Sequence, residues 1–239
     1  MLVLQVEGAH KRFGGIHAVR GVDLTVLPGE LLGLFGPNGA GKTTLFNLIA
    51  GTTPPTAGRI RLNGEDVTRL PAFRRAQLGI ARTFQVVRPF RSLTVIENVL
   101  AAVPSAAAAR RNDPDDAMAI LRNVALDHRA GDLAGQLTLG MLKRLEVARA
   151  LAIEPCLLLL DEPLAGLTAS EIADLLAFIA GLKSRTSIVM VDHNVRQSLA
   201  VCDRAVVLDA GAVIASGTPD EVRRNPEVVR AYLGEAAAA

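Results

Sequence analysis

The sequence predicts an α/β fold, in which a mainly parallel β-sheet is covered by helices on both faces and accompanied by an antiparallel β-layer and an inserted helical lobe. Apolar runs that do not alternate with polar residues, at Leu31–Phe35 and Leu157–Asp161, are typical of buried parallel strands. Alternating apolar residues near the start of the chain indicate the separate, half-buried antiparallel layer. Strand and helix patterns then follow one another in order, which favours a parallel sheet with helices on both sides.

The amino-terminal elements are predicted from alternation and from loop residues. The alternating positions of the β-layer are Val3, Val6, Val22, Leu24 and Val26. After the buried strand at Leu31–Phe35, a helix is expected over residues 44–50, closed by Gly51, followed by a proline-containing loop over residues 52–58. Short strands are expected at residues 60–62 and 80–83.

The middle of the chain has a different composition, and an inserted helical lobe is expected over residues 86–153. From Val95 to about Arg129 the sequence is rich in alanine and leucine, and Pro104 and Pro114 interrupt the helical pattern. The rest of the chain returns to α/β. Its expected elements are strands at 157–161 and 187–192, a helix at 170–183, a hairpin of 205–209 and 212–216, and helices at 219–225 and 226–233.

The composition excludes a disordered chain and a membrane-spanning one. Half of the 239 residues are hydrophobic and the formal net charge is only +2, whereas disorder requires low hydrophobicity and high net charge. The longest apolar runs are far shorter than the ~20 residues that a transmembrane helix needs, and the first residues lack the basic segment of a signal peptide. We therefore expect a cytoplasmic protein. Its two cysteines and four histidines are widely separated, and they suggest neither a disulfide framework nor a zinc site.

A phosphate-binding loop is predicted at residues 36–43, where the sequence fits G-x-x-x-x-G-K-[ST] between a buried strand and a helix. The glycines let backbone N–H groups surround a phosphate, and the helix directs its positive end at the anion. Lys42 is expected to reach the β- and γ-phosphate oxygens, and Thr43 to ligate Mg²⁺. The predicted ATP-binding residues here are Gly36, Asn38, Gly39, Gly41, Lys42, Thr43 and Thr44.

An acid pair follows the second apolar run. Asp161 and Glu162 end the strand at Leu157–Asp161, which is the Walker B arrangement when it accompanies a phosphate loop. Asp161 is expected to hold Mg²⁺, usually through water. Glu162 is placed to take a proton from the attacking water, so it is the predicted general base.

With these motifs the chain resembles the ATP-binding-cassette (ABC) ATPases over essentially its whole length. The resemblance implies a P-loop NTPase fold in a single domain over residues 1–239. Residues 1–85 and 154–239 would form the RecA-like core with its β-layer, and residues 86–153 the helical lobe. It also implies ATP as substrate and Mg²⁺ as cofactor.

The resemblance implies roles for three further residues. Phe13 stands where the family stacks an aromatic ring on adenine; the less favoured alternative is a phenylalanine that closes the core of the β-layer. Gln85 is similar to the Q-loop glutamine, which joins Mg²⁺ and water to the helical lobe and so belongs to both the catalytic and the metal-binding residues. His193 resembles the switch histidine that contacts the γ-phosphate, against the alternative of a structural histidine.

The signature loop departs from the family pattern Leu-Ser-Gly-Gly-Gln. Thr138 keeps the hydroxyl and Gly140 the second glycine, and both are expected to act on the nucleotide of a partner subunit. Leu139 and Met141 replace a glycine and a glutamine. Backbone N–H donation to a phosphate then depends on the φ and ψ angles that Leu139 can adopt. Thr168 also stands where the family usually has Asp or Asn.

Two subfamilies remain open as the source of the resemblance. Residues 82–90 and 93–99 and the tail segments 217–219, 225–227 and 231–235 are similar to the ATPases of branched-chain amino acid importers. Residues 192–196 and 199–202 are more similar to the ATPase of lipopolysaccharide export. Import of branched-chain or other hydrophobic amino acids is favoured, because the family docks its permease near the Q-loop.

The favoured subfamily implies a set of partners and a location. The partners are transmembrane permease subunits, a second ATP-binding subunit and, indirectly, a substrate-binding protein, with the chain on the inner face of the cell membrane. For the ATP-binding pair a heterodimer is favoured, with a homodimer as the alternative. A non-transport ABC ATPase acting on DNA or ribosomes is disfavoured, because the near-neutral charge and few aromatic residues predict no nucleic-acid partner. A third hypothesis is a non-catalytic regulatory cassette; the altered signature loop favours it, and Lys42, Glu162 and His193 argue against it.

A run of arginines marks the region next to the Q-loop. Its members are Arg74, Arg75, Arg82, Arg88 and Arg91, with no acid between the first and the last. The run is expected either to be a solvated basic face or to contact a permease and anionic lipid headgroups. Phe84 and Phe90 lie in the same segment and would suit a docking pocket.

Overall fold

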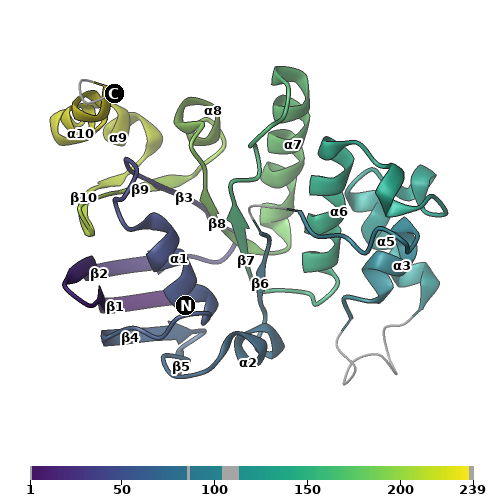
Figure 1. The fold of residues 1–239 in the computed structure, drawn as a ribbon, viewed down its shortest axis with the longest axis horizontal. Helices are drawn as coiled ribbons and strands as arrows, with labels where there is room; N and C mark the ends of the chain where they lie inside the picture. Colours follow the sequence, from purple (N-terminus) through teal and green to yellow (C-terminus); the bar gives the residue numbers. More distant parts are fainter. Residues whose placement is uncertain (1, 85–86, 104–112, 237–239) are drawn as a thin grey trace.

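The computed structural model describes residues 2–84, 87–103 and 113–236, and its centre is a six-stranded sheet in the order β10-β9-β3-β8-β7-β6 (Figure 1). Neighbouring strands from β9 to β6 are parallel, and β10 pairs antiparallel with β9. The strands are β3 (Leu31–Phe35), β6 (Ile80–Arg82), β7 (Leu157–Asp161), β8 (Ser187–Val191), β9 (Arg204–Asp209) and β10 (Ala212–Gly217). This sheet confirms the predicted mainly parallel α/β fold.

The register of the sheet brings three strand ends to one edge. Leu34 of β3 and Asp161 of β7 both lie opposite Val191 of β8. Because parallel strands end at the same edge, the residues that follow β3, β7 and β8 are neighbours. These are the phosphate loop, the acid pair and the segment with His193.

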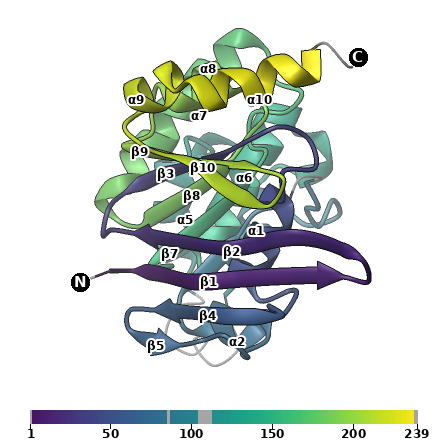
Figure 2. The same cartoon turned by 90° about the vertical axis from the view of Figure 1, so that its left-hand side faces the viewer.

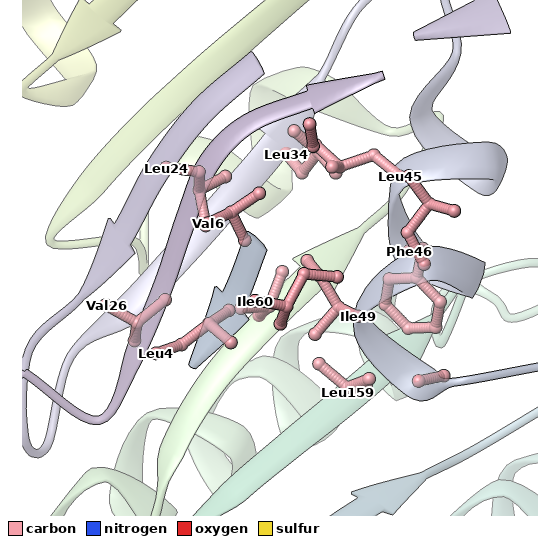
Figure 3. Close-up of a cluster of buried hydrophobic side chains, with 14 of the residues drawn as sticks. Leu4, Val6, Leu24, Val26, Leu34, Leu45, Phe46, Ile49, Ile60 and Leu159 are labelled. Carbon is pink, nitrogen blue, oxygen red and sulfur yellow. The ribbon is translucent and has the colours of Figure 1, made fainter. Parts of the chain in front are cut away.

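The predicted antiparallel layer is a four-stranded sheet in the order β2-β1-β4-β5, seen in Figure 2. Its strands are β1 (Leu4–Phe13), β2 (Ile16–Val26), β4 (Ala57–Leu62) and β5 (Glu65–Asp66). Helix α1 (Lys42–Ala50) packs between this layer and the central sheet. Figure 3 shows the interface, where Leu4, Val6 and Ile60 of the layer meet Ile49 of α1 and Leu159 of β7.

A second apolar cluster covers the other face of the central sheet. It joins Phe35, Leu158 and Met190 from the strands to Leu175 and Ile179 of α7. The helices on this side are α7 (Ala169–Gly181), α8 (Val195–Leu199), α9 (Pro219–Arg224) and α10 (Pro226–Ala236). Burying apolar residues on both faces explains why the central strands are uninterrupted apolar runs.

The predicted helical segment contains α3 (Val95–Leu100), α5 (Pro114–Asn123) and α6 (Leu139–Leu151), which enclose a third cluster (Figure 1). Val99, Leu121 and Leu145 meet in it. Pro114 is the first residue of α5, a position where a missing N–H costs no hydrogen bond. Pro104 lies outside the described residues. The domain boundaries at 86 and 153 stay a prediction.

Two helix boundaries differ from expectation. Helix α1 begins at Lys42, two residues earlier than predicted, because Gly41 is the last residue with non-helical backbone (φ 99°). Helix α10 continues to Ala236. The other predicted strands and helices are confirmed within a few residues.

The arginine run is not one basic face. Arg75, on α2 (Ala72–Gln77), is fully buried and donates to the backbone oxygens of Leu48, Ile49, Leu70 and Thr68. Two of these oxygens belong to the last turn of α1, where a cation suits the negative end of the helix dipole. Burial lowers the pKa of Arg75 to about 10.

The remaining arginines of the run divide in the same way. Arg82 is directed inward and pairs with Asp161. Only Arg74, Arg88 and Arg91 are exposed, so the expectation of a five-arginine surface is wrong.

We predict that Arg75→Met lowers the free energy of unfolding by about 2 to 4 kcal/mol, because it removes the donor that four backbone carbonyl groups share. Denaturant unfolding measures the change. Arg74→Met is the matched control, since Arg74 is exposed, donates to the side chain of Gln77 and lies over the ring of the exposed Phe73; it should change stability by less than about 0.5 kcal/mol. Equal stabilities for the two variants would contradict the role given to Arg75.

Candidate nucleotide site

The phosphate loop has the backbone that its glycines were predicted to allow. Gly36, Gly39 and Gly41 have φ angles of 144°, 75° and 99°, which disfavour residues with a Cβ. A Cβ at Gly36 would lie 2.1 Å from the backbone oxygen of Leu208, and one at Gly41 2.3 Å from that of Ala18. The loop is therefore packed closely between β9 and β2. Asn38 and Gly39 are exposed at its tip.

The loop also orients Lys42. Its Nζ atom donates to the backbone oxygens of Gly36 and Pro37, at 2.7 and 2.8 Å, and the side chain is buried. No side chain caps the first turn of α1, which begins at this lysine and includes Thr43 and Thr44. Backbone N–H groups, the positive helix end and an ammonium thus converge, as an oligophosphate requires.

The carboxylate of Asp161 is held by Arg82, a partner that the sequence did not indicate. Nη2 of Arg82 donates to Oδ2 of Asp161 at 2.9 Å, and Nη1 donates to Oδ1 of Asn47 at 2.7 Å. The guanidinium also lies over the rings of Phe46 and Phe84. Burial raises the pKa of Asp161, and the charge and hydrogen bond of Arg82 oppose that rise. Arg82 therefore links Asp161 of β7 to Asn47 of α1.

Glu162 is held in a left-handed backbone conformation, with φ of 48°. Its N–H donates to the backbone oxygen of Val191 at 2.8 Å, and its own carbonyl accepts from Nζ of Lys143 at 3.0 Å. A non-glycine residue in this region is strained, and such strain persists where neighbours fix the backbone. The conformation aims the side chain at His193, whose Nε2 lies 3.0 Å from Oε1 of Glu162.

Glu162 and His193 share a small cavity of about 250 Å³, which Asp192 and the loop at Leu164 also line. The side chain of Glu162 is 14% exposed and that of His193 is 54% exposed. Asp192 accepts the N–H groups of Leu164 and Asn194, so it fixes the loop backbone rather than facing the cavity as a free acid. The predicted base and the predicted switch histidine are therefore in contact at a partly open site.

Phe13 is 50% exposed at the end of β1, so the alternative that it closes the core of the β-layer is wrong. Nζ of Lys11 lies 5.0 Å from the centre of its ring. An exposed ring with a basic neighbour is suited to stacking on a base. Stacking on adenine stays a prediction.

Gln85 lies outside the described residues, but the residue before it is anchored. The N–H of Phe84 donates to Oε1 of Glu146 on α6, at 2.9 Å. Burial raises the pKa of Glu146. On the same face of α6, Arg149 donates to the backbone oxygen of Arg88 at 2.8 Å. With Lys143, these residues recur every third position and reach the acid pair and both sides of the Q-loop. The three-residue spacing of these charged side chains is the sequence signal that could have indicated their role in positioning the Q-loop.

Comparison with known sequences agrees with this geometry. The sequence model described as "ABC transporter" matches residues 19–165, which include the phosphate loop and the acid pair. The chain belongs to the ABC transporter ATPase family. A second model, "Branched-chain amino acid ATP-binding cassette transporter", matches residues 212–238.

Individual relatives of this ABC ATPase cover nearly its whole length. Two of them, BraF of Pseudomonas aeruginosa and LivG of Escherichia coli K12, are each described as a high-affinity branched-chain amino acid transport ATP-binding protein. Each is 41% identical, over 98% of both chains. The lipopolysaccharide export system ATP-binding protein LptB of Haemophilus influenzae is 39% identical, also over 98% of both chains. A solved structure of MJ1267, an ATP-binding cassette of an ABC transporter in its ADP conformation, has a TM-score of 0.89 and 30% identity, covering 98% of this chain and 99% of that one.

As an ABC ATPase the chain is an ATP-binding and ATP-hydrolysing subunit, of a family whose members pair with transmembrane permeases and dimerise. The predicted P-loop NTPase fold of the ABC cassette is thereby confirmed. Within residues 2–84, 87–103 and 113–236, no helix is both long and apolar enough to cross a membrane.

The signature loop of this ABC ATPase has ordinary backbone geometry despite its departures. Thr138 caps α6, and its Oγ1 accepts from the N–H of Met141 at 3.4 Å. Leu139 is the first residue of helix α6 and its φ angle is not positive. The leucine that replaces the glycine of the family pattern therefore causes no backbone strain. Gly140 lies in the first turn beside Glu171. The departure therefore resides in the side chains alone. Thr168 has a structural role, as the cap of α7.

Two of the three residues expected to bind Mg²⁺, Thr43 and Asp161, fit that ion. Thr43 is exposed in the first turn of α1, which follows β3, and Asp161 ends β7 at the same edge of the central sheet. Hydroxyl and carboxylate oxygens are the donors that Mg²⁺ prefers. Among the residues that the structure describes, no three His, Cys, Asp or Glu side chains form a metal-binding group.

We predict that Glu162→Gln lowers kcat at least about 100-fold with ATP affinity unchanged, because it removes the base and keeps the size of the side chain. Phosphate release and calorimetry measure the two quantities. Lys42→Ala is the contrasting variant, and should weaken ATP binding about tenfold or more through the lost contact with phosphate. Near wild-type turnover in the glutamine variant would remove Glu162 from this role.

Proposed function

We propose that this chain is the ATP-hydrolysing subunit of an importer of branched-chain or other hydrophobic amino acids. The match of residues 212–238 to the carboxyl-terminal model of branched-chain amino acid cassettes carries the proposal, because that segment lies outside the ATPase motifs common to the family. The names of the relatives BraF and LivG support it. Residues 192–202 and the relative LptB favour the alternative, lipopolysaccharide export.

In the proposed reaction Glu162 accepts a proton from the water that attacks the γ-phosphorus. The bond from phosphorus to the β–γ bridging oxygen then breaks, and ADP and phosphate leave. Lys42 and the N–H groups of the phosphate loop stabilise charge on the β- and γ-oxygens, and His193 donates to a γ-oxygen. Mg²⁺, held by Thr43, Asp161 and Gln85, would neutralise part of the phosphate charge. Phe13 orients the adenine.

A groove beside the Q-loop is the proposed permease dock. It has a volume of about 460 Å³ and lies where α2 and β6 face α6. Phe73 and Phe84 line it and are 63% and 53% exposed, and Arg88 adds positive charge. Exposed aromatic rings in a groove suit an inserted helix of a partner. Phe90 does not line the groove; it packs under the guanidinium of Arg149. Docking there would keep the chain on the inner face of the membrane.

We predict that Phe73→Ser reduces recovery of the permease in co-purification about tenfold without changing ATP affinity, because it removes an exposed ring from the groove. Val213→Ser is the control. It changes another exposed apolar residue, on β10 at the opposite edge of the central sheet from β6. Equal recovery for both variants would show that the permease binds elsewhere.

The second ATP-binding subunit of the assembly is proposed to be a different chain. ABC ATPases bind nucleotide between the phosphate loop of one subunit and the signature loop of the other, and Leu139 and Met141 make the signature of this chain atypical. We predict that Glu162→Gln protein with ATP stays largely monomeric alone and dimerises when the partner ATPase is added. Light scattering measures this. ATP-dependent homodimers of this variant, together with wild-type turnover that rises as the square of protein concentration, would favour the homodimer.

Transport in reconstituted vesicles tests the proposed cargo. The chain is assembled with its permease subunits, the second ATPase and the substrate-binding protein, and uptake of labelled leucine is measured with ATP on the side of this chain. Uptake abolished by Glu162→Gln is the expected result. Extraction of lipopolysaccharide without leucine uptake would replace the proposal with the export function.

A further inference from the structure

A tyrosine side chain of the carboxyl-terminal helix contacts the phosphate loop. Tyr232, on α10, is the only tyrosine of the chain. Its hydroxyl accepts a hydrogen bond from the N–H of Gly36 at 2.8 Å, across 196 positions of sequence. The ring packs against the second apolar cluster, to which Val228 of the same helix also belongs. Packing therefore holds the hydroxyl at the start of the loop.

Gly36 is a point where displacement would reach the nucleotide site. It is buried, and β9 confines it, since a Cβ there would lie 2.1 Å from the backbone oxygen of Leu208. Its own carbonyl accepts from Nζ of Lys42 at 2.7 Å. Gly36 thus donates its N–H to Tyr232, and its carbonyl oxygen accepts from the ammonium group of Lys42.

We infer that Tyr232 is a positioning residue for the phosphate loop, and that α10 helps to pre-organise Lys42 for nucleotide. The contact holds the first residue of the loop against β9. Pre-organised groups bind more tightly because less ordering is required on binding. The inference concerns the ATPase reaction and does not depend on the transported cargo.

Removing the hydroxyl alone isolates this effect. Tyr232→Phe keeps the ring in the apolar cluster but leaves a buried N–H without this acceptor, a loss that corresponds to about a 2- to 10-fold change in an equilibrium constant. Because the loop contacts phosphate in both ground and transition states, KM should rise with kcat nearly unchanged. Hydrogen exchange at the Gly36 amide should become faster.

The test uses the full chain with Tyr232→Phe and, as matched control, Val228→Ala, which removes packing from α10 but no hydrogen bond. ADP affinity by calorimetry in EDTA, ATP kinetics with Mg²⁺, melting temperature and exchange of the Gly36 amide are measured for each. The expected result is a 2- to 10-fold loss of ADP affinity in Tyr232→Phe only, with Val228→Ala lowering the melting temperature. Unchanged ADP affinity in Tyr232→Phe, or an equal loss in both variants, would overturn the inference.

Discussion

The burial of α1 between two sheets is the constraint on which the nucleotide site depends. Leu45, Phe46, Leu48 and Ile49 are fully buried, so the helix can neither rotate nor slide without exposing apolar surface to water. Its carboxyl end is satisfied by Arg75, whereas its amino end carries no side-chain cap. A helix fixed in this way directs the N–H groups of its first turn and its positive dipole end at the loop, which is the arrangement that phosphate requires.

Helix α6 connects the parts of the site that lie on different elements. Lys143 holds the carbonyl of Glu162, Glu146 holds the N–H of Phe84, and Arg149 holds the carbonyl of Arg88. All three charged groups are at least half-buried. Burial lowers the pKa of Lys143 and of Arg149 and raises the pKa of Glu146, which in each case favours the neutral form. Such groups are costly unless they are paired, so movement of α6 relative to the central sheet has to exchange these hydrogen bonds. A partner bound in the groove beside α6 would contact Glu146 and Arg149, on the same helix from which Lys143 holds Glu162.

The two acids of the pair are kept apart by their surroundings although they are adjacent in sequence. Asp161 ends a regular strand, is buried and is paired with Arg82. Glu162 turns out of the sheet through its left-handed backbone and meets His193. These different surroundings fit the separate roles proposed for the two carboxylates, charge binding for Asp161 and proton transfer for Glu162.

The sequence by itself determined most of the strands and helices, the phosphate loop and the acid pair, because each rests on residues that are close together along the chain. It did not indicate α2 or β5. Apolar periodicity and glycine spacing act locally, so they can be interpreted without knowing what packs against them. The sequence did not distinguish Arg75, which is buried, from the exposed Arg74 beside it, and it did not indicate that Arg82 pairs with an aspartate 79 positions away. Nor did it show that Tyr232 reaches Gly36, or that Leu139 has ordinary helical backbone. Only the tertiary structure decided these points, since the partner of a buried polar group depends on which elements the packing of the core brings together.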